Sequence, residues 1–132
     1  MIRLRFAALL ACLSCASVEN VITAEPGVAF SLPMGKTAAV AGTVNRITFT
    51  QVREDSRCPT NVVCVWQGDA KIEVSVWRNG APAEIAILSL GPQNNEAQLR
   101  DLAVRFVGLA PAPVTPEPAP RRYIAELVIR KL

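Results

Sequence analysis

The chain contains no histidine, and aromatic side chains make up only 5% of its 132 residues. Without histidine, neither a Ser-His-Asp nor a Cys-His catalytic arrangement can form, and the commonest metal ligand of proteins is missing. Catalysis by paired carboxylates or a lysine amine needs no histidine, but the 11 acidic residues form no dense cluster and the lysines, Lys36, Lys71 and Lys131, are far apart. We therefore expect a protein that is not an enzyme and binds no metal or cofactor. A carboxylate-based hydrolase is the alternative.

The excess of one sign of charge over the other is also small. The formal net charge is +3, and it falls to +1 if Arg3 and Arg5 are lost with an N-terminal segment, because the 14 basic residues become 12 against 11 acidic ones. Nucleic-acid-binding domains need a basic patch or stripe, so this balance argues against a nucleic-acid partner. The basic pairs Arg121-Arg122 and Arg130-Lys131 are predicted to be solvated ends of strands.

Long apolar runs are missing beyond the N-terminus. Residues 1–5 are short and basic, residues 6–16 are apolar, and Ser14 and Ala16 stand at the −3 and −1 positions of a signal peptidase site. The apolar run is too short for a permanent transmembrane helix. We therefore predict a signal peptide over residues 1–16 and a mature protein that is periplasmic or secreted.

A lipoprotein signal is the competing interpretation of the same segment. The four residues that end at Cys12, Leu-Leu-Ala-Cys, resemble a lipobox. In that case residues 1–11 would be removed, Cys12 would be lipidated as the mature N-terminus, and the lipid would anchor the protein to a membrane. Under both interpretations the polar residues 17–27 serve as a leader or tether, and residues 28–132 form a single β domain large enough to bury its own core.

The clearest secondary-structure pattern is the alternation over residues 71–78, which is typical of a half-buried strand. The apolar residues on its inner side are Ile72, Val74 and Val76. Asn79-Gly80 favours a tight hairpin turn, so residues 83–90 are expected to return antiparallel. Trp77 falls on the outer side of the strand, and its exposed indole is therefore a candidate for a binding patch.

Further short runs of alternating or β-branched residues predict strands at residues 28–32, 37–41, 43–53, 103–107 and 123–132. A bulge is expected near Gln51, where the apolar parity changes. Residues 96–102 fit either a strand or a helical turn, and the proline-rich residues 111–120 predict an extended loop. Together these elements predict an all-β fold, an antiparallel β-sandwich with an immunoglobulin-like Greek key as one arrangement. A partly closed β-barrel is the alternative.

Between the strands lies a loop with the two cysteines that remain after removal of a signal peptide. Cys58 and Cys64 are six positions apart, and Pro59 with Thr60-Asn61 favours a turn that brings the sulfurs together. A redox pair would typically use a C-x-x-C motif at a helix start, and a metal held by two thiolates would be under-coordinated. We therefore predict a structural disulfide, which stabilises the fold by about 2 kcal/mol for so short a loop.

Two interpretations fit the polar and aromatic residues around this loop. In the first, Arg57 and Trp66 are anchors of a recognition surface, since Trp and Arg dominate interface energies. In the second, Asp55 accepts hydrogen bonds from loop amides, Arg57 pairs with Asp55 or Asp69, and Trp66 covers the disulfide. The candidate binding residues are therefore Asp55, Arg57, Trp66, Asp69 and Trp77.

Residues 55–70 also carry a resemblance. Their pattern, D-S-R-C-P-x-x-V-x-C-V-W-x-G-D-A, is similar to one in small bacterial secreted proteins and lipoproteins of uncharacterised function, and the likeness extends from Phe30 to Ile129. The resemblance implies an exported β domain with a disulfide, and it implies no activity. We expect a non-enzymatic binding module of the cell envelope that contacts an envelope protein or a cell-wall component through this loop. A structural or stress-related envelope lipoprotein without a specific ligand is the alternative.

Overall fold

The computed structural model describes residues 20–117 and 121–132. The predicted signal peptide, the candidate lipidation residue Cys12 and residues 118–120 of the proline-rich loop lie outside the described residues. Within the described ranges, no helix is long and apolar enough to cross a membrane.

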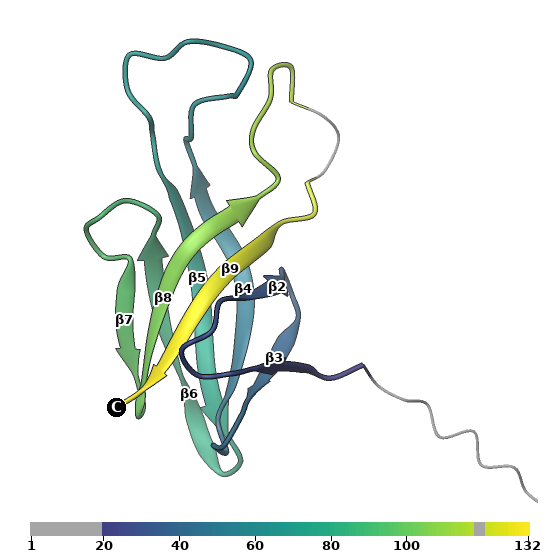
Figure 1. The fold of residues 1–132 in the computed structure, drawn as a ribbon, viewed down its shortest axis with the longest axis vertical. Helices are drawn as coiled ribbons and strands as arrows, with labels where there is room; N and C mark the ends of the chain where they lie inside the picture. Colours follow the sequence, from purple (N-terminus) through teal and green to yellow (C-terminus); the bar gives the residue numbers. More distant parts are fainter. Residues whose placement is uncertain (1–19, 118–120) are drawn as a thin grey trace, which may run out of the picture.

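The described residues form nine β-strands and no helix (Figure 1). The strands are β1 (Ile22–Ala24), β2 (Phe30–Pro33), β3 (Thr37–Val40), β4 (Arg46–Asp55), β5 (Ala70–Arg78), β6 (Ala81–Ser89), β7 (Glu96–Leu99), β8 (Leu102–Ala110) and β9 (Ile124–Lys131).

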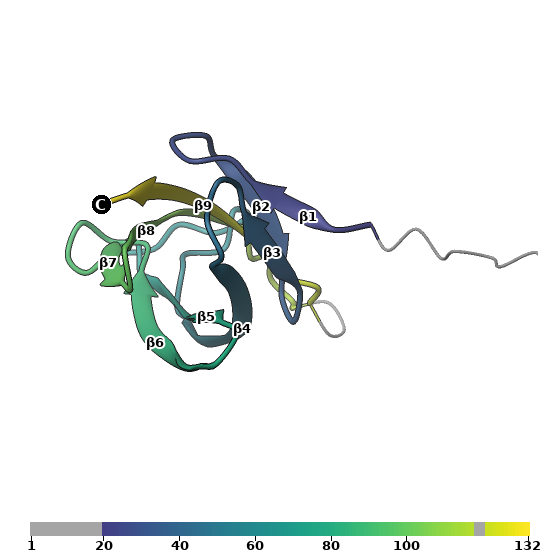
Figure 2. The ribbon, with the colours of Figure 1, turned by 90° about the horizontal axis from the view of Figure 1, so that it is seen from below.

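The strands form two packed sheets, which confirms the predicted β-sandwich. One sheet has the order β1-β3-β4-β5-β6 and the other has the order β2-β9-β8-β7. The pairs are antiparallel except for β1, which runs parallel to β3. Figure 2 shows β4, β5 and β6 curving strongly, which brings β6 towards β7. No strand ladder joins β6 to β7 within the described residues, so the fold is not a closed barrel.

The connections follow a simple meander within each sheet. Strands β3 to β6 are neighbours both in the sequence and in their sheet, and so are β7 to β9 in theirs. In the constant-type immunoglobulin arrangement, by contrast, no more than two strands that follow one another in the sequence lie in the same sheet. The sandwich architecture is therefore present with a connectivity that differs from the immunoglobulin Greek key.

The core lies between the two sheets and follows the alternation of the sequence. Side chains of β5 at alternate positions are fully buried, as the pattern over residues 71–78 predicts, and those of β4, β8 and β9 meet them from both sheets. The largest of these buried side chains include Ile47, Phe49, Ile72, Val74, Val76, Phe106, Leu127 and Ile129. Removal of this apolar surface from water is the main driving force that holds the sheets together.

The predicted bulge occurs in β4. The register between β4 and β5 shifts between Phe49 and Gln51 and again between Val52 and Glu54. Each shift adds a residue on β4 and increases the local twist. The end of β4 at Asp55 is thereby directed towards the loop with the disulfide.

One sequence prediction needs correction, and one alternative left open by the sequence is decided. Part of the expected leader, Ile22–Ala24, is strand β1, and Ala24 is fully buried in the core because β1 adds to the sheet beside β3. The stretch 96–102, which fits strand or helical turn in sequence, is strand β7 followed by a tight turn into β8, with Arg100 at a positive φ of 57°. In both places pairing with a neighbouring strand outweighs local propensity.

The strand directions place the candidate binding residues at two opposite ends of the sandwich. The β4–β5, β6–β7 and β8–β9 connections lie together at one end, which we call the loop end, while the β5–β6 hairpin lies at the other (Figure 1). Asp55, Arg57, Trp66 and Asp69 belong to the loop end.

Candidate functional site

The predicted disulfide is present at the loop end. Cys58 and Cys64 are joined with an S–S distance of 2.11 Å, and their Cα atoms are 5.9 Å apart. Among the described residues, no group of three or more His, Cys, Asp or Glu side chains could hold a metal ion. The bridge closes a small ring within the β4–β5 connection.

Asp55, the last residue of β4, is the centre of a buried ionic cluster. Its Oδ1 accepts a hydrogen bond from Arg57 Nε at 2.7 Å, and its Oδ2 accepts bonds from Arg57 Nη2 at 2.9 Å and Arg121 Nη1 at 2.9 Å. The Tyr123 hydroxyl donates to the same Oδ2 at 3.1 Å. The side chains of Asp55 and Arg121 are only 9% and 8% exposed. Such a cluster is stable only because every charge in it has a partner.

The cluster shifts the pKa values of two of its members in opposite directions. Burial raises the pKa of Asp55, but the hydrogen bond and the charge of Arg57, together with the bond from Tyr123, outweigh it and hold the pKa below its ordinary value of 3.8. Burial raises the pKa of Tyr123 above 10.0, and its bond to the Asp55 carboxylate adds to the increase. At neutral pH the Asp55 carboxylate is therefore ionised and Tyr123 is protonated.

Arg57 also donates hydrogen bonds to the backbone at the end of β8. Nη1 donates to the Leu109 carbonyl oxygen at 2.6 Å, and Nη2 donates to the Pro111 carbonyl oxygen at 2.9 Å. Its side chain is 13% exposed. The pairing of Arg57 with Asp55 is as the second interpretation of the sequence predicts. Arg57 therefore joins the end of β4 to the end of β8 and offers little surface to a partner.

Asp69 has the role that the sequence suggested for Asp55. Its Oδ1 accepts hydrogen bonds from the backbone amides of Ala70, Leu90 and Gly91 at 2.8, 3.1 and 3.0 Å. The last two belong to the β6–β7 connection. Asp69 thus ties the disulfide loop to the neighbouring connection and does not pair with Arg57.

The base of the disulfide loop is a narrow, hydrogen-bonded hairpin. The amide of Ser56 donates to Asp69 O at 2.7 Å, and the amide of Cys58 donates to Gln67 O at 2.9 Å. Gly68 crosses this hairpin with a φ of +70°, and a Cβ at this position would lie 1.7 Å from Ser56 O. Only glycine fits so close an approach of two backbones.

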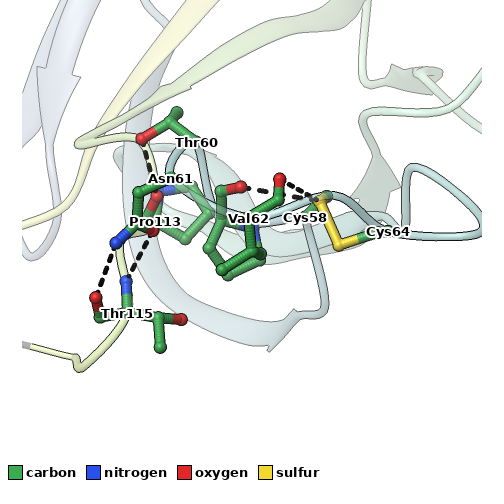
Figure 3. The surroundings of a disulfide bond; sticks show 8 residues. Cys58, Thr60, Asn61, Val62, Cys64, Pro113 and Thr115 are labelled. Carbon is green, nitrogen blue, oxygen red and sulfur yellow. Dashed lines mark hydrogen bonds between the residues drawn. A yellow bond between two sulfur atoms is a disulfide. The ribbon is translucent and has the colours of Figure 1, made fainter.

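The proline-rich segment is attached to the far side of the same loop. The Thr60 amide donates to Pro113 O at 2.9 Å, and the Asn61 side chain both donates to Thr115 O at 2.6 Å and accepts from Thr115 N at 2.9 Å (Figure 3). These bonds join the β4–β5 connection to the β8–β9 connection. The Asn61 side chain donates to and accepts from the backbone of Thr115, as the backbone of a neighbouring strand would.

The outermost residues of the disulfide loop are apolar and exposed. Val63 and Val65 are fully exposed, Trp66 is 72% exposed and Val62 is 42% exposed. We call these four residues the apolar tip. The sequence suggested that Trp66 covers the disulfide. Its indole instead borders a hollow of about 360 Å³ that also reaches both cysteines, so it does not seal the bridge.

Trp77 lies at the opposite end of the sandwich and forms no part of this site. It lies on the outer face of β5, as its position in the alternation predicts, but it is partly buried and not exposed as expected. The guanidinium carbon of Arg46 lies 5.5 Å from the centre of its ring, within the range of a cation–π contact. The structure therefore separates Trp77 from the other candidate binding residues.

Two residues of the cluster were missed in the sequence. Arg121 was expected to be a solvated strand end, which is wrong, because its side chain is 8% exposed and bonds to Asp55. Tyr123 was given no role beyond the start of the strand predicted at residues 123–132. No local pattern could have revealed either role, because 66 and 68 residues separate them from Asp55.

The described residues therefore define a two-sheet β-sandwich domain whose loop end is held by a disulfide, a buried ionic cluster and hydrogen bonds between connections. Comparison of the chain with protein-family models, with curated protein sequences and with solved structures found no match. The resemblance to small secreted proteins and lipoproteins stays a prediction.

Proposed function

We propose that the protein is a non-enzymatic binding module of the cell envelope and that its contact surface is the apolar tip. The observation that carries this proposal is the exposure of Val63, Val65 and Trp66 on a loop whose base is otherwise closely bonded. Contiguous exposed apolar side chains on a monomeric protein commonly mark an interaction surface.

The construction of the loop supports a binding role. A contact segment that is ordered before binding loses less conformational entropy when a partner arrives. The disulfide, Arg57 and Asn61 each hold part of this loop or its neighbour in place. Trp66 is the residue type most enriched among interface hot spots, which makes it the expected anchor.

Arg57 has a different part in this proposal from the one the sequence suggested. Its donors are occupied by Asp55, Leu109 and Pro111 within the domain. Arg57 therefore positions the loops, and the tip makes the contact.

The acidic residues of the loop end favour structural roles over hydrolysis. A carboxylate-based hydrolase needs one acid that holds a proton near neutral pH beside a second carboxylate. The pKa of Asp55 is lowered by its hydrogen bond and charge interaction with Arg57 after allowance for burial, and Asp69 is bonded to three backbone amides.

Export of the protein belongs to the same proposal. Structural disulfides persist in oxidising compartments such as the periplasm, and the bridge between Cys58 and Cys64 agrees with such a location. The residues of the predicted signal, whether ordinary or of the lipoprotein type, precede the described part of the chain.

The test is cross-linking in cells from a photoreactive residue at position 63. We expect it to capture a protein or lipid adduct, and we expect Trp66→Ser to reduce the yield while the domain stays folded. The matched control is the same photoreactive residue at Val44, which is 72% exposed and lies outside the loop end. Adducts from position 63 that do not exceed those from position 44 would refute the proposal and favour an envelope protein without a specific ligand.

A further inference from the structure

The loop end carries no charged side chain near its outermost part. Residues 58–68 and residues 106–116 contain no Asp, Glu, Lys or Arg. Arg57 and Asp69, which flank the first run, lie at the base of the loop and are bonded within the domain. Glu117, which follows the second run, is exposed and pairs with Arg121. The outer parts of these two connections therefore present a neutral surface, to which Val114 of the second connection adds another exposed apolar side chain.

From this surface we infer that the apolar tip inserts into the interfacial region of a lipid bilayer. This inference rests on the proposed function and names the partner of the same surface. Interfaces between proteins generally have a polar or charged rim around an apolar centre. The apolar tip has no such charged rim. It therefore suits a partner that is itself apolar and has no charged groups to pair with, such as the acyl-chain boundary of a bilayer.

The shape of the tip supports the same partner. Val63 and Val65 are fully exposed, and the β4–β5 connection that carries them extends beyond the end of the sandwich (Figure 1). A rigid protein partner would need a pocket for each projecting side chain, whereas lipid chains pack around any convex apolar surface. Trp66 beside them is the residue type that favours the headgroup level of membranes.

Polar groups below the outermost residues of the disulfide loop are bonded to each other or to the facing connection, which lowers the cost of bringing this part of the loop end to a membrane interface. The amides of Cys58, Thr60 and Val62 donate to carbonyl oxygens within the two connections. The Asn61 amide group and the Thr115 backbone satisfy one another. Unsatisfied polar groups are what excludes most loops from apolar media.

The expected mode of insertion is shallow and insensitive to lipid charge. An apolar segment that lies at the interface enters about 5–10 Å into the boundary between headgroups and acyl chains. Because the loop end lacks basic side chains near the tip, anionic lipids should add little to binding, and salt should remove little.

The experiment follows the environment of Trp66 in the full chain. Trp77→Phe makes Trp66 the only tryptophan, so its fluorescence reports the tip alone. This readout is needed because the apolar N-terminal segment could itself hold the chain on a vesicle. The probes are vesicles of phosphatidylcholine, with and without phosphatidylglycerol, and vesicles of brominated phosphatidylcholine.

We expect a blue shift of Trp66 emission and quenching by brominated lipid, both equal in neutral and anionic vesicles and both retained at high salt. Val63→Ser with Val65→Ser should abolish most of the shift, whereas Val44→Ser should leave it unchanged. Circular dichroism of each variant confirms that it is folded.

Three outcomes would overturn the inference: no shift with any vesicle, a shift that requires phosphatidylglycerol and disappears with salt, or equal loss in the Val44→Ser control. If the residue at position 63 nevertheless captures a protein in cells, the binding function stands and the lipid inference alone fails. If neither vesicles nor cells yield a contact, both fail.

Discussion

The Tyr123 hydroxyl donates a hydrogen bond to Asp55 Oδ2 at 3.1 Å, and this bond links the residue before β9 to the end of β4. The two residues are 68 positions apart in the chain. The bond favours the ionised form of Asp55 and the protonated form of Tyr123. Each of these two residues can therefore be used to monitor the cluster.

Tyr123 is the single tyrosine of the chain, so alkaline titration of tyrosinate absorbance follows it directly. We expect a pKa above 10.0 in the native protein, because burial and the bond to Asp55 both disfavour the phenolate. Asp55→Asn should move the pKa of Tyr123 back towards 10.0. Glu54→Gln, which changes an exposed neighbour, is the control and should leave it unchanged. An unaltered titration in Asp55→Asn would contradict the bond.

Asp55 should also contribute to acid sensitivity. Its pKa in the folded protein lies below the ordinary value of 3.8, so its stabilising effect is fully present above that pH and is lost as the pH falls through the folded value. We expect urea denaturation to show a smaller stability difference between the native protein and Asp55→Asn at about pH 2.5 than at about pH 6. A constant difference across this range would show that folding does not lower the pKa of Asp55.

Substitution of Arg57 should loosen the loop end as a whole. Arg57→Ala removes bonds to Asp55, Leu109 and Pro111, and we expect the free energy of unfolding to fall by about 2–4 kcal/mol. Arg57→Lys should recover only part of this loss, because an ammonium group lacks the planar fork of donors.

The control for Arg57 is Lys71→Ala. Lys71 pairs with Glu54, and both side chains are close to half exposed. Exposed pairs of this kind contribute about 0–1 kcal/mol. Urea denaturation of both variants gives the comparison, and a cost for Arg57→Ala no larger than that for Lys71→Ala would contradict the role of Arg57.

Gly68 should tolerate no side chain. Gly68→Ala would place its Cβ 1.7 Å from Ser56 O at a backbone φ of +70°, so we expect a loss of stability larger than the cost of the left-handed conformation alone. Gly80→Ala is the matched control, since Gly80 has a similar φ of +78° but no atom within 4 Å of an added Cβ. It should cost about 1–2 kcal/mol. Thermal unfolding of the two variants separates steric contact from backbone strain.

Loss of the disulfide should change the loop more than the fold. Joint replacement of Cys58 and Cys64 by Ser removes the constraint on a short ring, which corresponds to about 2 kcal/mol. The base of the loop keeps its bonds at Ser56 and Cys58 N, so we expect the core strands to retain protection from hydrogen exchange while the amides of Thr60 and Val62 lose it. Uniform loss of protection over both sheets would show that the bridge holds the whole domain.

Much of the fold could be predicted because it depends on local patterns. The alternation at Ile72, Val74 and Val76 assigns the inner face of β5, since successive side chains of a strand point to opposite sides. The Asn79-Gly80 turn determines the antiparallel return of β6 in the same local way. The short spacing between Cys58 and Cys64 allowed their pairing to be predicted.

The sequence by itself thus determined most of the strands, the hairpin and the disulfide, because each follows from residues near one another in the chain. Only the tertiary structure decided that Arg121 and Tyr123 meet Asp55, that Ala24 lies in the core, and that Trp66 is 72% exposed. These features depend on how the two sheets pack and how their connections meet at one end. No local pattern encodes such contacts, because their energies arise between residues that only folding brings together.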